Sequence, residues 1–214
     1  MKKLWIIGDS FSDNFYSPND AEESWKNLYC KYKGYHPKFF GEFVSEDLHM
    51  DYEILTKGIF DNYKMIELFI DNMDRFNEGD IISFGWTATS RIRFVNESTN
   101  QWEVINSYGM KGDYFQGMAI STLADIAANR YHKLYKIELM KWTKLISKSL
   151  PNISIIHWTW TNNSYFRYET ISDETQKKLN DLHWSENGHR QFADWFIGVH
   201  NKQIENKCFE SFIY

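Results

Sequence analysis

The sequence is poor in the residues that interrupt or crosslink a chain. Its 214 residues include three prolines, 11 glycines and two cysteines. With so little proline and glycine, and no low-complexity stretch, nothing reads as a linker between domains. We therefore expect a single domain over residues 1–214. Cys30 and Cys208 are too few for a disulfide framework and far apart in sequence, so we expect free thiols.

Long apolar runs and an excess of positive charge are also missing. No stretch approaches the roughly 18 apolar residues of a membrane span, and the apolar run at 4–7 is too short for the core of a signal peptide. Twenty-four basic against 29 acidic residues give a net charge of -5, without the basic excess of a nucleic-acid-binding protein. Unless a leader was removed, we expect a protein made in the cytosol, with neither nucleic acid nor a membrane as partner.

What the sequence does contain is a regular alternation of two kinds of apolar pattern. A hydrophobic share of 43% suffices for a full core. Short apolar runs predict strands at 4–7, 52–55, 81–84 and 153–156, and helical spacing predicts helices at 37–49, 63–73, 118–149 and 192–199. Strands that alternate with helices predict βαβ units, and hence a parallel sheet with helices on both faces.

Two polar stretches break this alternation, at about 14–36 and about 91–117. Both follow predicted strands, and ligands of open parallel sheets bind at the carboxyl ends of strands. We interpret the two stretches as cleft-lining insertions. The alternative is that they are ordinary surface loops.

The first chemistry-bearing residue is Ser10, in Gly8-Asp9-Ser10 directly after the first predicted strand. A turn from a strand to a helix exposes the side chain and leaves backbone N–H groups free to bind an anion. A serine there can act as a nucleophile if a base takes its proton. The alternative is that Asp9, Ser10 or Ser12 caps the following helix.

A second polar segment, Asn180-Asp181-Leu182-His183, precedes the last predicted helix. A histidine can act as the base for a serine, and a nearby carboxylate can hold the ring in the required tautomer. Asp181 is placed to do this for His183. Together with Ser10, these residues have the composition of a catalytic triad.

The positions of these residues resemble the SGNH/GDSL hydrolase family of esterases, lipases and carbohydrate deacetylases. The resemblance covers nearly the whole chain and rests on Gly8-Asp9-Ser10, on Gly58 between strand and helix, and on the Asp181/His183 pair. It implies a flavodoxin-like fold, a three-layer α/β/α sandwich around a mostly parallel sheet. It also implies Ser10 as nucleophile, His183 as base and Asp181 as the residue that orients it, with no metal and no organic cofactor.

The family binds the oxyanion with backbone N–H groups, here those of Ser10 and Gly58, and with a side-chain donor. The family's third motif provides an asparagine for this purpose, but this chain has Gly85-Trp86-Thr87-Ala88. We predict Thr87 or Asn62 as the third donor. The family most often has its aspartate three residues before the histidine, a position that Asn180 occupies here, so Asn180 is the second choice after Asp181.

Aromatic residues and one arginine lie next to these motifs. We expect Trp86, Trp158 and Trp184 to contact substrate, because aromatic rings around a polar cleft suit a sugar. We expect the same of Arg91, because the resemblance extends to branches of the family that have an arginine soon after a Trp-Thr pair. The alternative for each tryptophan is that it fills a gap between loops and sheet. We expect His157 and His189 to be buried and hydrogen-bonded or packed. No spacing typical of a metal site is present.

The expected function is that of a serine esterase that forms an acyl-enzyme and hydrolyses a short-chain acyl ester, with an acetylated carbohydrate as the expected substrate. One alternative is a catalytically weak module that binds carbohydrate or serves in virion assembly. Another is an O-acyltransferase on the same fold. Accordingly, we expect a cytoplasmic or virion-associated protein. The sequence does not specify its oligomeric state.

Overall fold

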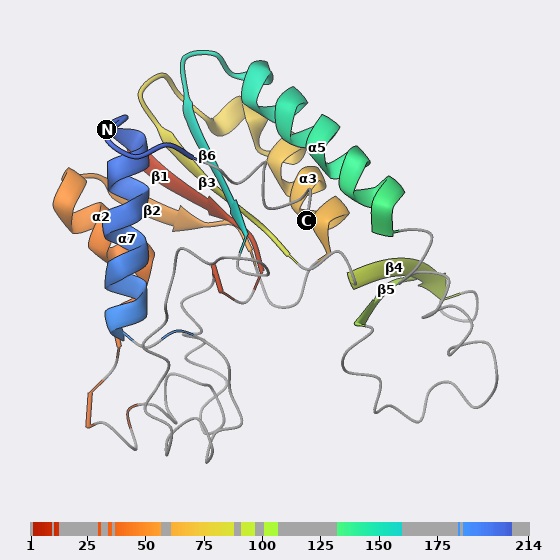
Figure 1. Ribbon diagram of the computed structural model, residues 1–214, viewed down its shortest axis with the longest axis horizontal. Helices are drawn as coiled ribbons and strands as arrows, with labels where there is room; N and C mark the ends of the chain where they lie inside the picture. The colour runs from red at the N-terminus through yellow and green to blue at the C-terminus, as the bar shows by residue number, and fades with distance from the viewer. Residues whose placement is uncertain are drawn as a thin grey trace.

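The computed structural model has a four-stranded parallel sheet at its centre (Figure 1). It describes residues 2–9, 11–12, 30, 34–35, 37–56, 61–87, 91–96, 101–106, 132–159, 184 and 186–206. The sheet consists of β1 (Lys3–Ile7), β2 (Asp51–Ile54), β3 (Ile81–Trp86) and β6 (Ser154–Thr159), in the order β2-β1-β3-β6. The helices are α2 (Phe40–Leu48), α3 (Asn62–Asp71), the short 3₁₀ helix η1 (Met73–Arg75), α5 (His132–Ser149) and α7 (Glu186–His200).

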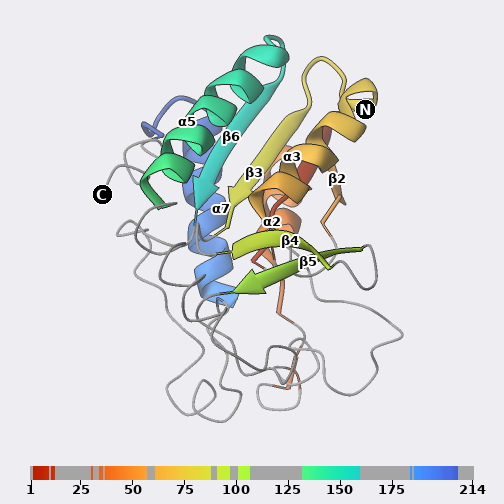
Figure 2. The ribbon, with the colours of Figure 1, turned by 90° about the vertical axis from the view of Figure 1, so that its right-hand side faces the viewer.

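The helices cover both faces of this sheet. In Figures 1 and 2, α2 and α7 lie on one side, and α3 and α5 lie on the other. The predicted α/β/α sandwich with a parallel sheet is therefore confirmed. The strand order matches the central part of the flavodoxin-like arrangement, in which the chain changes direction between its first and third strands. Here that switch point lies between β1 and β3.

Alternation along the strands explains why two separate cores form. Successive strand residues point to opposite faces, so Leu4 and Ile6 join the core under α2 and α7, while Trp5 and Ile7 join the core under α3 and α5. Each helix presents a matching apolar stripe to one of these cores. The sheet is thus buried on both faces, as a parallel sheet requires.

Two helix starts follow directly from the sequence. Asp61 precedes α3 and accepts a hydrogen bond from the backbone N of Lys64 at 2.8 Å, so it is an N-cap. Before α2, the Glu42 carboxylate accepts from the backbone N of Phe39 at 2.8 Å. Both helices begin within three residues of the predicted positions.

One element is absent from the predictions. Within the polar stretch 91–117, β4 (Arg91–Asn96) and β5 (Gln101–Asn106) pair as an antiparallel hairpin. The hairpin lies beyond the carboxyl ends of the parallel strands in Figures 1 and 2. The predicted helix 118–149 is described from His132 onward, and its earlier part lies outside the described residues. No helix in the described part combines the length and apolarity that crossing a membrane would need.

Candidate active site at the switch point

The chain turns sharply after β1. The backbone N of Ser12 donates to the carbonyl of Asp9 at 2.8 Å, and the Asp9 carboxylate accepts from the backbone N of Phe11 at 3.1 Å. Gly8 donates its backbone N–H to the hydroxyl of Thr56, just after β2, at 2.7 Å. The described residues of this turn, 8–9 and 11–12, are therefore hydrogen-bonded both to one another and to the segment that follows β2.

Close packing under this turn requires glycine at two positions. A Cβ on Gly8 would overlap the side chain of Ser12, and a Cβ on Gly85 in β3 would lie 2.5 Å from the ring of Trp158. The Ser12 hydroxyl is buried between the two glycines and has no hydrogen-bond partner in the described part of the chain. Because Gly8 and Gly85 have no side chains, the turn can pack directly against the end of β3.

Asn62, the first residue of α3, pairs with the backbone at the end of β3. Its amide oxygen accepts from the backbone N of Thr87 at 2.8 Å, and its amide nitrogen donates to the carbonyl of Thr87 at 3.2 Å. The side chain therefore bonds Thr87 as a neighbouring strand would. Since Asn62 is fully buried, it rigidly connects the start of α3 to the carboxyl end of β3.

The hydroxyl of Thr87 connects this pair to the turn after β1. It donates to the carboxylate of Asp9 at 2.6 Å. Asp9, Asn62 and Thr87 are each at most 1% exposed, so these bonds form away from water. The three residues span the switch point from α3 through β3 to the turn at Gly8-Asp9. A hydroxyl has a single proton, and this one is directed at Asp9. The Thr87 hydroxyl would therefore have to leave Asp9 to bind an oxyanion, and the choice between Thr87 and Asn62 as third donor stays a prediction.

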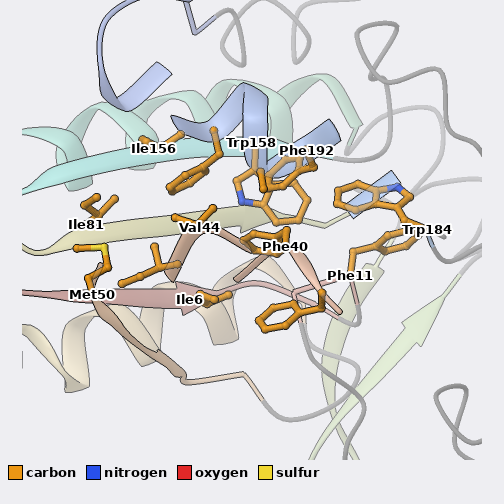
Figure 3. Close-up of a cluster of buried hydrophobic side chains, with 14 residues drawn as sticks. Ile6, Phe11, Phe40, Val44, Met50, Ile81, Ile156, Trp158, Trp184 and Phe192 are labelled. Atoms are coloured by element: carbon orange, nitrogen blue, oxygen red, sulfur yellow. The ribbon is translucent and has the colours of Figure 1, made fainter. Parts of the chain in front are cut away.

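An aromatic contact joins this turn to the last part of the chain. The ring centroids of Phe11 and Trp184 are 5.5 Å apart, and Figure 3 shows the two side chains together at one end of the core cluster. Trp184 also packs against Trp158 and Phe192, with centroids 5.8 and 4.9 Å away. Phe11 follows Ser10 and Trp184 follows His183, so the immediate neighbours of these two predicted residues lie in contact.

The three described tryptophans among the predicted substrate contacts are buried. Trp86, Trp158 and Trp184 are at most 2% exposed, and each packs in one of the two cores. The indole N–H of Trp158 donates to the Ser83 hydroxyl at 2.9 Å. This packing agrees with the alternative that tryptophans fill gaps between loops and sheet. Substrate contact by any of them stays a prediction.

His157 is buried beside Trp86, as expected. The Trp86 indole N–H donates to its Nδ1 at 3.2 Å, and its Nε2 lies 3.0 Å from the Ser147 hydroxyl. Because Nδ1 accepts, the neutral ring carries its proton on Nε2 and donates to Ser147. Burial lowers the pKa of His157 to about 3. His157 therefore acts as a neutral structural bridge between β6 and α5.

A buried tyrosine hydroxyl lies on the α5 side of this region. Tyr135 stacks obliquely on Tyr63, with ring centroids 5.7 Å apart. Burial raises the pKa of the Tyr135 hydroxyl, an effect that the nearby Asn62 amide opposes. The hydroxyl nevertheless forms no hydrogen bond of good geometry within the described part of the chain. On the side towards α5, the Asn62 amide therefore has the Tyr135 hydroxyl as a polar neighbour, in addition to the backbone of Thr87.

Several predicted site residues lie outside the described residues. These are Ser10, Gly58, Asn180, Asp181 and His183. Arg91 begins β4, but only its backbone is described. Their predicted roles stay predictions.

Within the described ranges, no group of three or more His, Cys, Asp or Glu side chains could hold a metal. His189 packs against Phe39, Phe40 and Trp184, as expected for a buried ring. Cys30 is a free thiol.

Sequence reasoning missed the part that Asp9 plays. The residue was considered as a helix cap, whereas its carboxylate accepts from Thr87, 78 positions later. The Phe11–Trp184 contact was missed as well. Asp9 and Phe11 flank Ser10, and Trp184 follows His183. The spacing of residues within a motif carries no information about which distant side chains they contact.

Comparison with known proteins yields one structural similarity. No protein-family model matches the sequence, and no curated protein matches it. A solved structure of a carbohydrate esterase, described as having an active site with divergent catalytic and non-catalytic binding functions, superimposes with a TM-score of 0.42. The identity is 13%, and the match covers 97% of this chain and 70% of that chain.

Proposed function

We propose that the protein is a serine esterase of the SGNH type that hydrolyses a short-chain acyl ester. Ser10 attacks the ester carbonyl while His183 takes its proton, and Asp181 orients the imidazole. His183 then protonates the leaving alcohol, and water releases the acyl group from Ser10 by the same steps in reverse. Asn180 is the second choice for the orienting residue.

The observation that carries this proposal is the contact between Phe11 and Trp184. It joins the turn that contains Ser10 to the segment that contains His183, with ring centroids 5.5 Å apart. Residues 173 positions apart in sequence meet at the carboxyl ends of the strands, where open α/β sheets bind their ligands. A nucleophile and its base must be brought within hydrogen-bond reach, and this contact supports such proximity.

The buried hydrogen bonds among Asp9, Asn62 and Thr87 support the proposal in a second way. They hold the turn at residues 8–12 against the end of β3. Catalysis by an oxyanion hole depends on donors that are fixed before the reaction starts. In the proposal these donors are the backbone N–H groups of Ser10 and Gly58. The third donor is Asn62, whose amide nitrogen donates to the Thr87 carbonyl and lies near the Tyr135 hydroxyl, so it has to turn from one of these partners to bind the oxyanion.

The direct test is labelling with a serine-reactive fluorophosphonate, followed by mass measurement. We expect one adduct on the native protein and none on Ser10→Ala. The matched control is Ser149→Ala, which removes an exposed serine at the end of α5 and should keep the adduct. Turnover of a short p-nitrophenyl ester should fall at least about 10³-fold in Ser10→Ala. An unlabelled native protein, or an adduct that persists in Ser10→Ala, contradicts the proposal.

One observation favours a second function, a binding module with little or no catalysis. The Thr87 hydroxyl, where the family has an asparagine amide, donates to Asp9. The loss of one oxyanion donor typically slows turnover by about 10²–10³-fold. This alternative predicts no fluorophosphonate adduct, together with measurable binding of an acetylated oligosaccharide by calorimetry. The sugar part of either function rests on the family resemblance, since the described tryptophans are buried.

A further inference from the structure

The outward face of α5 combines apolar and positively charged side chains. Leu134, Ile137 and Leu145 are 69%, 51% and 57% exposed, and Lys141, Lys144 and Lys148 are also exposed. At 100° per residue, these six side chains fall within an arc of about 100° on the helix. We refer to these six residues as the α5 outer face. The opposite side of the helix, with Tyr135, Leu139 and Ile146, is buried in the core.

This exposure is concentrated, not scattered. The described part of the chain has six large exposed apolar side chains, and three of them belong to the α5 outer face. Isolated exposed apolar residues are common and need no explanation, but three on the same face of one helix indicate a contact surface. In Figure 2, α5 lies on the viewer's side of the sheet, and none of the other described helices and strands covers it.

The charge of α5 contrasts with that of the chain. Five lysines and one glutamate give the helix a formal charge of +4, whereas the whole chain carries -5, so the remaining residues carry -9. No ion pair joins Lys141, Lys144 or Lys148 to a described acidic residue. A positive face on an acidic protein selects for a negatively charged partner.

We propose that the α5 outer face binds the surface of an anionic lipid bilayer. Lysines near such a surface are attracted by its negative potential, while aliphatic side chains insert at the boundary between headgroups and acyl chains. A polyanion such as nucleic acid would match the lysines but would leave Leu134, Ile137 and Leu145 without an apolar partner. Protein interfaces are depleted in lysine, and a second copy would bring like charges together. The bilayer satisfies both kinds of side chain.

This contact is independent of the proposed esterase activity. It also departs from the expectation of no membrane partner, which rested on the lack of a spanning segment. A helix that lies in the plane of the membrane needs no such segment. The α5 helix is already held by its buried side, so its outer face is presented without a folding step.

The test is sedimentation with vesicles of phosphatidylcholine alone, or with about 30% phosphatidylserine. We expect the native protein to sediment with the anionic vesicles only, and to be released as salt rises from about 0.1 M to about 0.5 M. Two triple variants separate the contributions, Lys141→Gln/Lys144→Gln/Lys148→Gln and Leu134→Gln/Ile137→Gln/Leu145→Gln. Each should reduce the partition coefficient at least about tenfold.

The matched control is Lys202→Gln/Ile204→Gln, which changes an exposed lysine and an exposed isoleucine after α7 and should bind as the native protein does. Circular dichroism and melting curves verify that all variants are folded. The proposal is overturned if the native protein stays in the supernatant with anionic vesicles, or if either folded triple variant binds as well as the native protein. It is also overturned, in favour of a second copy, if ultracentrifugation shows a dimer that the apolar triple variant abolishes and vesicles bind nothing.

Discussion

Two buried aspartates join β1 to the β3 segment at opposite edges of the sheet. Asp80, at the amino edge, accepts from the backbone N of Lys3, the indole of Trp5 and the backbone N of Asn77, at 2.8 to 2.9 Å. Asp9, at the carboxyl edge, accepts from the backbone N of Phe11 and the hydroxyl of Thr87. Both carboxylates are at most 2% exposed, and both satisfy the rule that a buried charge must be hydrogen-bonded.

The surroundings of the two residues differ. Near the amino edge, Glu53 pairs with both Lys3 and Arg75, and both cations lie over the Trp5 ring. At the carboxyl edge, Asp9 precedes the predicted nucleophile and is bonded to a residue that follows the next strand. In the proposed esterase, the same buried group would serve stability at one edge and the position of Ser10 at the other.

The largest expected difference between the edges is in turnover. Asp9→Asn leaves one oxygen for two donors, so either Phe11 or Thr87 loses its acceptor and the turn with Ser10 shifts. Displacements of about 1 Å can cost about 10²-fold in rate. We expect kcat for a p-nitrophenyl ester to fall by about that factor, with KM little changed. Asp80→Asn should change kcat less than about threefold. Equal losses in the two variants would show that both aspartates act through stability alone.

Glycine substitutions should separate steric crowding from backbone strain. Gly8→Ala places a Cβ against the buried Ser12 side chain, and overpacking of this kind costs about 1–3 kcal/mol. Gly79, near the amino edge, has a φ of +86°, so Gly79→Ala should cost about 1–2 kcal/mol through its backbone conformation. The free energy of unfolding in urea measures both. Ser12→Gly should rescue Gly8→Ala only. If it does not, crowding under the turn is not the cause.

His157, near the carboxyl ends of β3 and β6, should make stability sensitive to acid. Its folded pKa of about 3 is below the ordinary value of 6.5. As pH falls below 6.5, His157 binds a proton in the unfolded chain but stays neutral in the folded chain. The free energy of unfolding therefore decreases between about pH 6.5 and pH 3. The slope is at most about 1.4 kcal/mol per pH unit. Urea unfolding at a series of pH values measures this effect. The free energy of unfolding should depend more steeply on pH in the native protein than in His157→Gln. Parallel pH profiles would contradict the assignment.

The smallest effect is expected at the ion pairs of the amino edge. The side chains of Lys3 and Glu53 are 32% and 33% exposed, and pairs of this exposure contribute at most about 1 kcal/mol. Glu53→Gln removes this pair and the pair with Arg75, so it should lower the free energy of unfolding by at most about 1 kcal/mol for each pair, and the difference should shrink in high salt. If Asp80→Asn lowers the free energy of unfolding no more than Glu53→Gln does, the exposed charges hold this edge together as strongly as the buried aspartate, and the expected contrast is wrong.

Much of the fold was predictable because local pattern and tertiary structure agree. The strand at 4–7 and the helices at 37–49 and 63–73 were expected within three residues of their observed bounds, since their apolar periods report directly which face is buried. The hairpin β4–β5 was missed because the stretch 91–117 is polar overall, although Arg91-Ile92-Arg93-Phe94 and Gln101-Trp102-Glu103-Val104 alternate between polar and apolar residues, which is the pattern of strands. The predicted triad stays a prediction, since Ser10, Asp181 and His183 lie outside the described residues.

The sequence by itself determined the layered α/β architecture, because period-2 and period-3.6 patterns alternate along the chain and each must bury an apolar face. It also specified which motifs are candidates for chemistry. Only the tertiary structure decided the partners. It directed the Thr87 hydroxyl to Asp9, paired Asn62 with the Thr87 backbone and set Phe11 against Trp184. These contacts join residues 25 to 173 positions apart in sequence, and a local pattern contains no information about which distant side chain will fill a given space.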